Sequence, residues 1–159
     1  MVGVIALVFA LRADFVSNAT LPKTNVYTDC GGKNVSPALH WSGAPEAARS
    51  FVLTVFDPDA PREGGWWHWI AFNILPSTQS LPANSGARAS ATSGVFAKND
   101  FGHPRYDGPC PPPGKPHRYV FTLYALDVPQ VHIADGPGVD AALRGHILAK
   151  AEVIGRYGR

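Results

Sequence analysis

The sequence predicts a mainly β protein, an antiparallel sandwich of two sheets with a long loop rich in proline and glycine and one short helix near the C-terminus. Three observations predict this class. Short runs of β-branched and aromatic residues recur, segments rich in proline and glycine separate them, and only one late segment has a helical period. The run SFVLTVF at 50–56 is apolar at nearly every position, which is typical of a strand covered on both faces.

The predicted elements follow one another along the chain. The apolar run at 2–11 predicts a buried N-terminal strand, because it is shorter than the roughly 20 residues that span a bilayer and no basic residue precedes it as in a signal peptide. Further strands are predicted at 50–56, 68–75, 119–126 and 149–157. The stripe of Val139, Leu143 and Ile147 predicts a helix over 139–147.

Two long segments between these elements are predicted loops. Segment 76–94 is small and polar without periodicity, and segment 99–116 is dense in proline and glycine. The strand pattern is the same on both sides of these loops. We therefore expect one domain over 1–159.

Composition limits the classes of partner. The chain has 159 residues and a net charge of +2 from 14 basic and 12 acidic side chains, and no basic run concentrates that charge. Binding to nucleic acid is not expected, and no transmembrane segment is predicted. The lack of a signal-peptide pattern favours a cytoplasmic location, while secreted and periplasmic locations stay open, as does the choice between monomer and homodimer.

The only two cysteines, Cys30 and Cys110, lie in polar loops beside glycine or proline. They form no C-x-x-C pair and are too few to build a zinc site. The sequence leaves open whether they form a disulfide, because it does not show that the two loops meet.

Titratable side chains gather at the ends of three predicted strands. Asp57 ends the first of these strands, His68 opens the next on the face of Ile70, and His117 and Tyr119 begin the third. Imidazole and phenol groups beside backbone N–H groups of a glycine-rich loop are suited to an anion such as phosphate. We therefore expect these strand ends to converge on one binding site.

The same residues suit other chemistry. Asp57, Asp59, His68 and His117 are of the types that ligate a metal, as in a metal-assisted hydrolase, although no H-E-x-x-H spacing is present. A G-x-S-x-G elbow is absent as well, so the sequence offers no serine nucleophile for acyl hydrolysis. The patterns favour a noncatalytic binder without a cofactor.

The order of several motifs is more specific than any one residue. DPDAP at 57–61 is followed by WWHW at 66–69 and by GPCPPPGKPHRY at 108–119, with CGGKNVSPALHW at 30–41 and GHILAKAEVIGRY at 145–157. Together they resemble the phosphatidylethanolamine-binding protein family, also called Raf kinase inhibitor-like, in its bacterial and archaeal branch. The resemblance covers about 25–157.

The resemblance implies a β-sandwich with an anion-binding pocket. Carried over by motif, the expected binding residues are Asp57, Asp59, His68, His117 and Tyr119, with walls from Trp66, Pro61, Gly108, Pro109, Cys110 and Pro111. The family also carries a cis proline in DPDAP, so the Ala60–Pro61 bond is expected to be cis.

Two functions follow from the resemblance. The first is noncatalytic binding of a small anion, a phosphorylated ligand or a phospholipid head group, with a regulatory role. The second is inhibition of a serine protease or a kinase through surface loops, of which 76–94 is the candidate.

Overall fold

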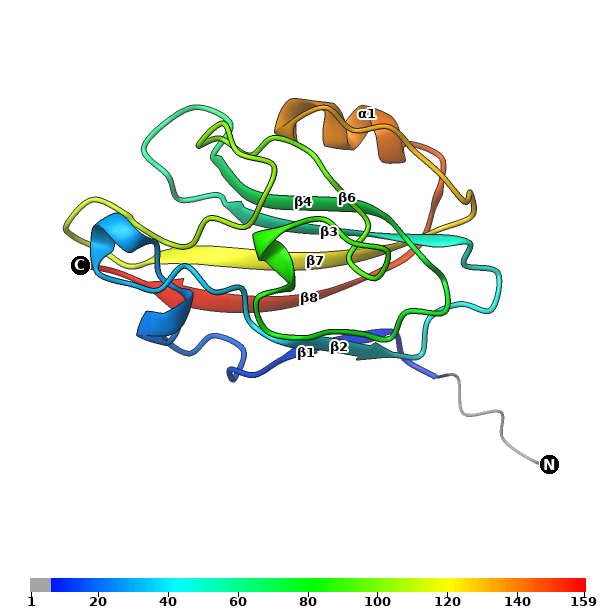
Figure 1. The fold of residues 1–159 in the computed structure, drawn as a ribbon, viewed down its shortest axis with the longest axis horizontal. Coiled ribbons are helices and arrows are strands. Elements are labelled where there is room, and N and C mark those ends of the chain that lie inside the picture. Colours follow the sequence, from blue (N-terminus) through cyan, green and yellow to red (C-terminus); the bar gives the residue numbers. More distant parts are fainter. Residues whose placement is uncertain (1–6) are drawn as a thin grey trace.

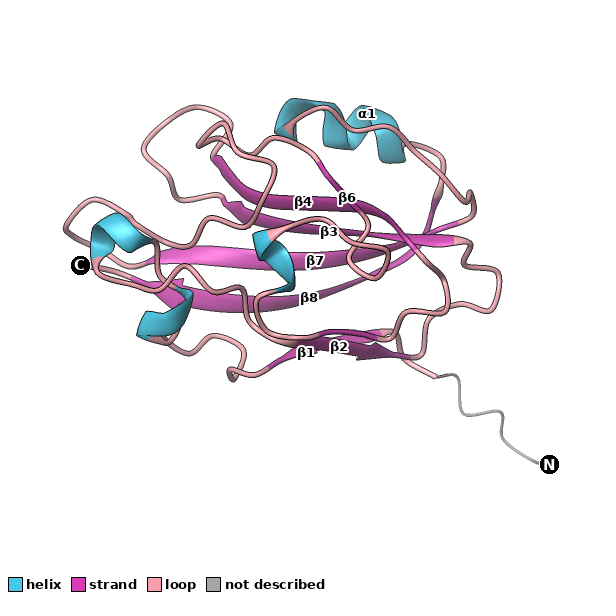
Figure 2. Cartoon of the chain, in the orientation of Figure 1, coloured by secondary structure: helices cyan, strands magenta, loops and turns pink. Residues whose placement is uncertain are grey.

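The computed structural model describes residues 7–159, which form two antiparallel sheets, as the sequence predicts. Figures 1 and 2 show the sheets stacked, with the single α-helix on the outer side of the larger one. The smaller sheet has the order β1 (Ala10–Ala13), β2 (Leu39–Ser42) and β5 (Ser80–Leu81). The larger has the order β6 (Val95–Phe96), β4 (Trp66–Ile74), β3 (Ser50–Asp57), β7 (His117–Leu126) and β8 (Ile147–Tyr157).

Strand β3 lies in the middle of the larger sheet and is buried on both faces, which explains its apolar run. One face packs in the main core, where Phe51 and Leu53 meet side chains of the smaller sheet. The other face carries Val52, which packs in a second cluster with Val139 of α1 (Val139–Leu143). The molecule therefore has three layers, a helix, a five-stranded sheet and a three-stranded sheet.

Strands β7 and β8 pair over ten positions and show the predicted alternation. In β8 the charged Lys150, Glu152 and Arg156 are exposed, whereas Ala151 and Val153 on the intervening positions are buried. Because β7 and β3 are also antiparallel, the end of β3 lies beside the beginning of β7. This arrangement brings the candidate residues of different strands to one end of the sheet.

Two predicted elements have different limits in the structure. The helix ends at Leu143 because Arg144 has an extended ψ of 124° and Gly145 a left-handed φ of 79°, so the exposed Ile147 belongs to β8. The predicted strand at 2–11 begins only at Ala10. Residues 1–6 lie outside the described residues, and the side chains at 7 and 8 are about 80% exposed, so the buried strand that we expected there is wrong for this part.

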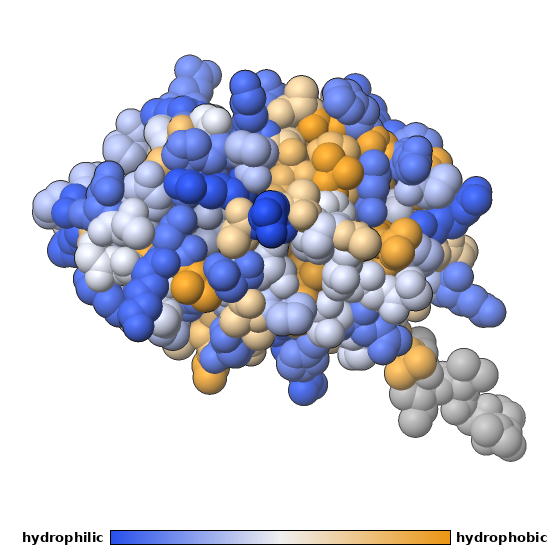
Figure 3. Space-filling view, viewed as in Figure 1, coloured by the Kyte–Doolittle hydropathy of each residue, from blue (hydrophilic) through white to orange (hydrophobic). Residues whose placement is uncertain are grey.

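The loops within residues 7–159 contain four short 3-10 helices. They are η1 (Lys23–Asn25), η2 (Thr28–Cys30), η3 (Ser85–Ala87) and η4 (Gly136–Gly138). The predicted loop at 76–94 contains η3 and the short strand β5, and the proline-rich loop at 99–116 has no helix or strand. On the face shown in Figure 3, hydrophilic residues predominate toward the left, and hydrophobic residues gather toward the upper right.

Candidate functional site

A cavity of about 220 Å³ lies at the end of the larger sheet where β3 ends and β7 begins. Its lining comes from β3, β4, β7 and two loops that cover this end of the sheet. The lining residues are Asp57, Ala60, Pro61, Trp66, His68, Phe101, Cys110, Pro111, Pro112, His117 and Tyr119. The three strand ends therefore do converge, and most of the residues that the sequence singled out line one space.

A β-bulge places His68 on the cavity side of the sheet. Val55 pairs with Trp69 but Phe56 pairs with Trp67, so His68 is an extra residue in β4 with no partner in β3. The strict alternation that we expected, with His68 on the face of Ile70, is therefore wrong at this point. A bulge redirects the side chain of the extra residue, and His68 packs edge-on against Tyr119 with ring centroids 5.1 Å apart.

Asp57 and His117 form a buried pair on the cavity wall. Nδ1 of His117 lies 2.8 Å from Oδ2 of Asp57, and both residues are at least 90% buried. The other carboxylate oxygen of Asp57 accepts a hydrogen bond of 2.8 Å from the backbone N–H of Asp59. Because the carboxylate fixes the orientation of the imidazole, Nε2 is the nitrogen of His117 that remains for a ligand.

His68 is held by the backbone of the loop at 99–116. Its Nδ1 lies 2.6 Å from the carbonyl oxygen of Asp107, which can only accept, so Nδ1 carries a proton and donates. Burial lowers the pKa of His68, and the Asp107 carbonyl and nearby carboxylates oppose this only in part. The imidazole is therefore neutral near pH 7 with Nε2 unprotonated, which makes His68 a hydrogen-bond acceptor toward the cavity.

The carboxylate of Asp107 is fully buried and anchors this loop. Four side chains donate to its two oxygens at 2.8 to 3.0 Å. They are Asn34 and Arg105 on Oδ1, and Asn99 and His103 on Oδ2. Sequence reasoning did not single out Asp107, although DPDAP and HRY lie on either side of the loop that carries it. A buried carboxylate held by four donors has little freedom to move, so it fixes the carbonyl that orients His68.

Two polar groups on the cavity lining have no partner among residues 7–159. They are the hydroxyl of Tyr119 and the indole Nε1 of Trp66, both buried. Burial and the nearby Asp57 raise the pKa of Tyr119, so the phenol keeps its proton and is a donor. Buried polar groups in folded proteins are nearly always hydrogen bonded, so these two donors indicate a place for a polar ligand or water.

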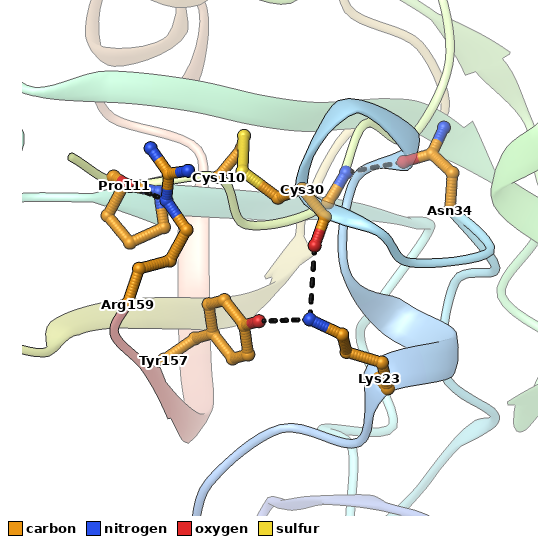
Figure 4. The surroundings of a disulfide bond; sticks show 8 residues. Lys23, Cys30, Asn34, Cys110, Pro111, Tyr157 and Arg159 are labelled. Atoms are coloured by element: carbon orange, nitrogen blue, oxygen red, sulfur yellow. Dashed lines mark hydrogen bonds between the residues drawn. A yellow bond between two sulfur atoms is a disulfide. The ribbon is translucent and has the colours of Figure 1, made fainter. Parts of the chain in front are cut away.

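The wall opposite the strands contains Cys110, which forms a disulfide with Cys30. The question that the sequence left open is thus answered by the tertiary structure, in which η2 lies beside the proline-rich loop. Figure 4 shows how the bridge is held, with the Cys30 carbonyl accepting from Lys23 at 3.1 Å and the Pro111 carbonyl accepting from Arg159 at 2.7 Å. The disulfide ties Cys110 to η2, and the bond from Arg159 holds the next wall residue, Pro111.

Three residues expected at the site do not line the cavity. Asp59 is exposed and makes a bidentate ion pair with Arg118, whose hydrogen bonds lower the pKa of Asp59 to about 2. Gly108 and Pro109 instead pack against the 25–27 segment, where the Pro109 carbonyl accepts from the N–H of Tyr27 at 3.0 Å. They position the wall without forming it.

The structure adds residues that sequence reasoning missed. Ala60, Phe101 and Pro112 line the cavity, and the Phe101 ring lies 5.3 Å from that of Trp66 and 5.5 Å from that of His68. Phe101 lies in the predicted loop at 99–116, and a lone phenylalanine in a loop has no distinguishing signal in the sequence.

One backbone prediction at the site is wrong. No peptide bond in the described part of the chain is cis, so the Ala60–Pro61 bond is trans. The turn is formed instead by Asp57, whose side chain accepts from the N–H of Asp59, and by two left-handed glycines, Gly64 at φ 82° and Gly65 at φ 67°. An Asx-type turn followed by glycine reverses the chain without a cis bond.

Within 7–159, no three histidine, cysteine or acidic side chains are grouped so that they could hold a metal ion. No helix in this range is long and apolar enough to cross a membrane.

Comparisons with known proteins agree on one family. The family model described as "Phosphatidylethanolamine-binding protein" matches residues 12–158. The UPF0098 protein YbhB of Escherichia coli is 40% identical over 144 residues, which are 86% of this chain and 91% of YbhB. A UPF0098 protein of Aquifex aeolicus is 40% identical over 159 residues, 97% of this chain and 90% of the relative.

A solved structure agrees with the sequence matches. The crystal structure of YbcL from E. coli, described as a new member of the mammalian PEBP family, is 37% identical to this chain with a TM-score of 0.90. The superposition covers 95% of this chain and 98% of YbcL.

Proposed function

The chain belongs to the phosphatidylethanolamine-binding protein family, and on that premise we propose that its cavity binds a small phosphorylated anion without catalysis. The anion is phosphate itself or the phosphoryl group of a phosphomonoester or lipid head group. The observation that carries the proposal is the buried, unpartnered hydroxyl of Tyr119 on the cavity wall. A donor held in this way is stabilised by a ligand oxygen.

The neighbouring groups suit a partly protonated phosphoryl group. Tyr119 and the Trp66 indole donate, whereas the neutral His68 accepts at Nε2. A monohydrogen phosphate or a phosphomonoester monoanion carries oxygens that accept and a P–OH group that donates to His68. The same group thus satisfies all three side chains.

The cavity size agrees with a small ligand. Its volume of about 220 Å³ has room for a phosphoryl group and a short substituent, and Trp66 and Phe101 offer aromatic surface for that substituent. The ring faces of aromatic residues attract ammonium groups, so phosphoethanolamine is a good probe of what lies next to the phosphoryl group.

Two tyrosine variants test the proposal. Tyr119→Phe removes only the unpartnered hydroxyl, so we expect an unchanged free energy of unfolding and roughly tenfold weaker binding of inorganic phosphate in titration calorimetry, the loss of about one charge-assisted hydrogen bond. Tyr106→Phe is the matched control, because its buried hydroxyl donates to the Asn25 carbonyl at 2.7 Å and does not line the cavity.

The control should show the opposite pattern. Tyr106→Phe is expected to lose about 1 kcal/mol of stability and to bind phosphate like the wild type. Equal phosphate affinity in Tyr119→Phe and the wild type, or no phosphate binding by the wild type at all, would contradict the proposed function.

A further inference from the structure

A second groove of about 510 Å³ adjoins the cavity. Pro112 and His117 line both spaces, so the two meet at the imidazole that pairs with Asp57. The groove also has three basic side chains, those of Lys115, Arg118 and Arg156, and one acidic side chain, that of Asp59.

The charges of the groove are unbalanced. Arg118 and Arg156 lie directly opposite each other in the pairing of β7 with β8, and like charges in this position destabilise a strand pair. Asp59 compensates only Arg118, with bonds of 2.8 and 2.9 Å to the guanidinium. Within the described range, no acidic side chain forms an ion pair with Arg156 or Lys115.

The backbone is restrained at both of these unpaired residues. The backbone N–H of Arg156 donates to the carbonyl of Ala19 at 2.9 Å and its carbonyl accepts from the N–H of Leu21 at 2.8 Å, while β8 pairs with β7 on its other side. Lys115 lies between the prolines at 113 and 116, which restrict the chain on both sides. A rigid backbone reduces the entropy that a ligand must overcome to order the site.

From this geometry we propose that the groove is a second anion subsite and that the ligand carries at least two phosphoryl groups, one in the cavity and one between Arg156 and Lys115. The inference rests on the proposed function, because it extends the ligand from the cavity past His117. Guanidinium groups bind phosphoryl oxygens in a bidentate manner and lysine adds a mobile positive charge. The second phosphoryl group would also relieve the repulsion between the facing arginines.

Calorimetric titration with inorganic phosphate, pyrophosphate and tripolyphosphate at constant ionic strength tests the inference. For the wild type we expect one of the longer anions to bind at least tenfold more tightly than phosphate. Arg156→Gln and Lys115→Gln should each remove most of this preference while changing phosphate affinity less than about twofold. Arg144→Gln, an exposed arginine after α1 that lines neither space, is the matched control for charge alone.

The outcomes separate the two proposals. Phosphate binding without tighter binding of either longer anion overturns the second subsite and leaves the proposed function intact, as does an Arg156→Gln effect no larger than that of Arg144→Gln. Failure of phosphate to bind the wild type overturns the proposed function. If phosphate does not bind but the longer anions do, and only Arg156→Gln weakens them, the proposal of one ligand that occupies both the cavity and the groove is also wrong.

Discussion

Breaking the Cys30–Cys110 disulfide should remove a large part of the stability of this protein. The bridge joins residues 80 positions apart, so its loss frees a long segment of the unfolded chain. The chain-entropy model gives about 4.5 kcal/mol at 25 °C for a closed loop of this length. Domains of this size are typically stable by only about 5–15 kcal/mol. A Cys30→Ser/Cys110→Ser variant should therefore unfold at a much lower urea concentration.

Urea unfolding followed by tryptophan fluorescence measures this difference, with and without a reductant. The wild type should lose about 3–5 kcal/mol on reduction, whereas the double serine variant should be equally unstable in both conditions. Any difference between the variant with and without reductant measures the effect of the reductant itself. A loss of less than about 1 kcal/mol in both the reduced wild type and the variant would refute the reasoning, because the loop-closure entropy would then be absent.

Three further perturbations follow from the site. Burial lowers the pKa of His68 in the folded state, so below about pH 6.5 the unfolded chain binds more protons than the folded chain. The free energy of unfolding should therefore fall as the pH decreases, by at most about 1.4 kcal/mol per pH unit. In urea unfolding at several pH values, His68→Gln should show a weaker dependence on pH in this range. Asp107→Asn removes the negative charge and replaces one acceptor oxygen with an NH2 group, so the two donors on that oxygen, either Asn34 and Arg105 or Asn99 and His103, lose their acceptor. The variant should be destabilised by about 3 kcal/mol, and unchanged unfolding would contradict the anchoring role. Gly108→Ala places a Cβ 2.0 Å from the Asn25 carbonyl and should lower stability by about 1–3 kcal/mol in thermal melts, whereas Gly138→Ala, with its nearest atom at 3.5 Å, should not.

Much of the fold could be predicted because the strands of the larger sheet are long and strongly patterned. Both faces of β3 are buried, so its apolar run predicts a strand covered on both sides. In β8 the charged residues mark the exposed face of that strand. The helix boundary was missed because Ile147 continues the apolar spacing of Val139 and Leu143, although Gly145 between them ends the helix. The short strands β5 and β6, of two residues each, give no periodic signal.

The candidate site was predictable where a motif ends a strand. Asp57, His117 and Tyr119 lie where the alternation of β3 and β7 puts them. Alternation gave the wrong face for His68, because the register shift opposite Val55 and Phe56 arises from the pairing of β3 with β4, which the sequence of one strand does not show. Asp59 lies outside the cavity that Asp57 lines, because it forms an ion pair with Arg118, a contact that the sequence does not show.

The sequence by itself determined which residue types would meet at this end of the sheet, because strand alternation, rigid prolines and the order of the motifs are local properties of the chain. Only the tertiary structure decided which of them share one cavity and what each can do there. Hydrogen-bonding state, burial and the pairing of the cysteines depend on groups brought together from distant parts of the chain. The Asp107 carbonyl accepts from Nδ1 of His68, which leaves Nε2 as an acceptor. The buried hydroxyl of Tyr119 has no partner among the described residues and is therefore a free donor.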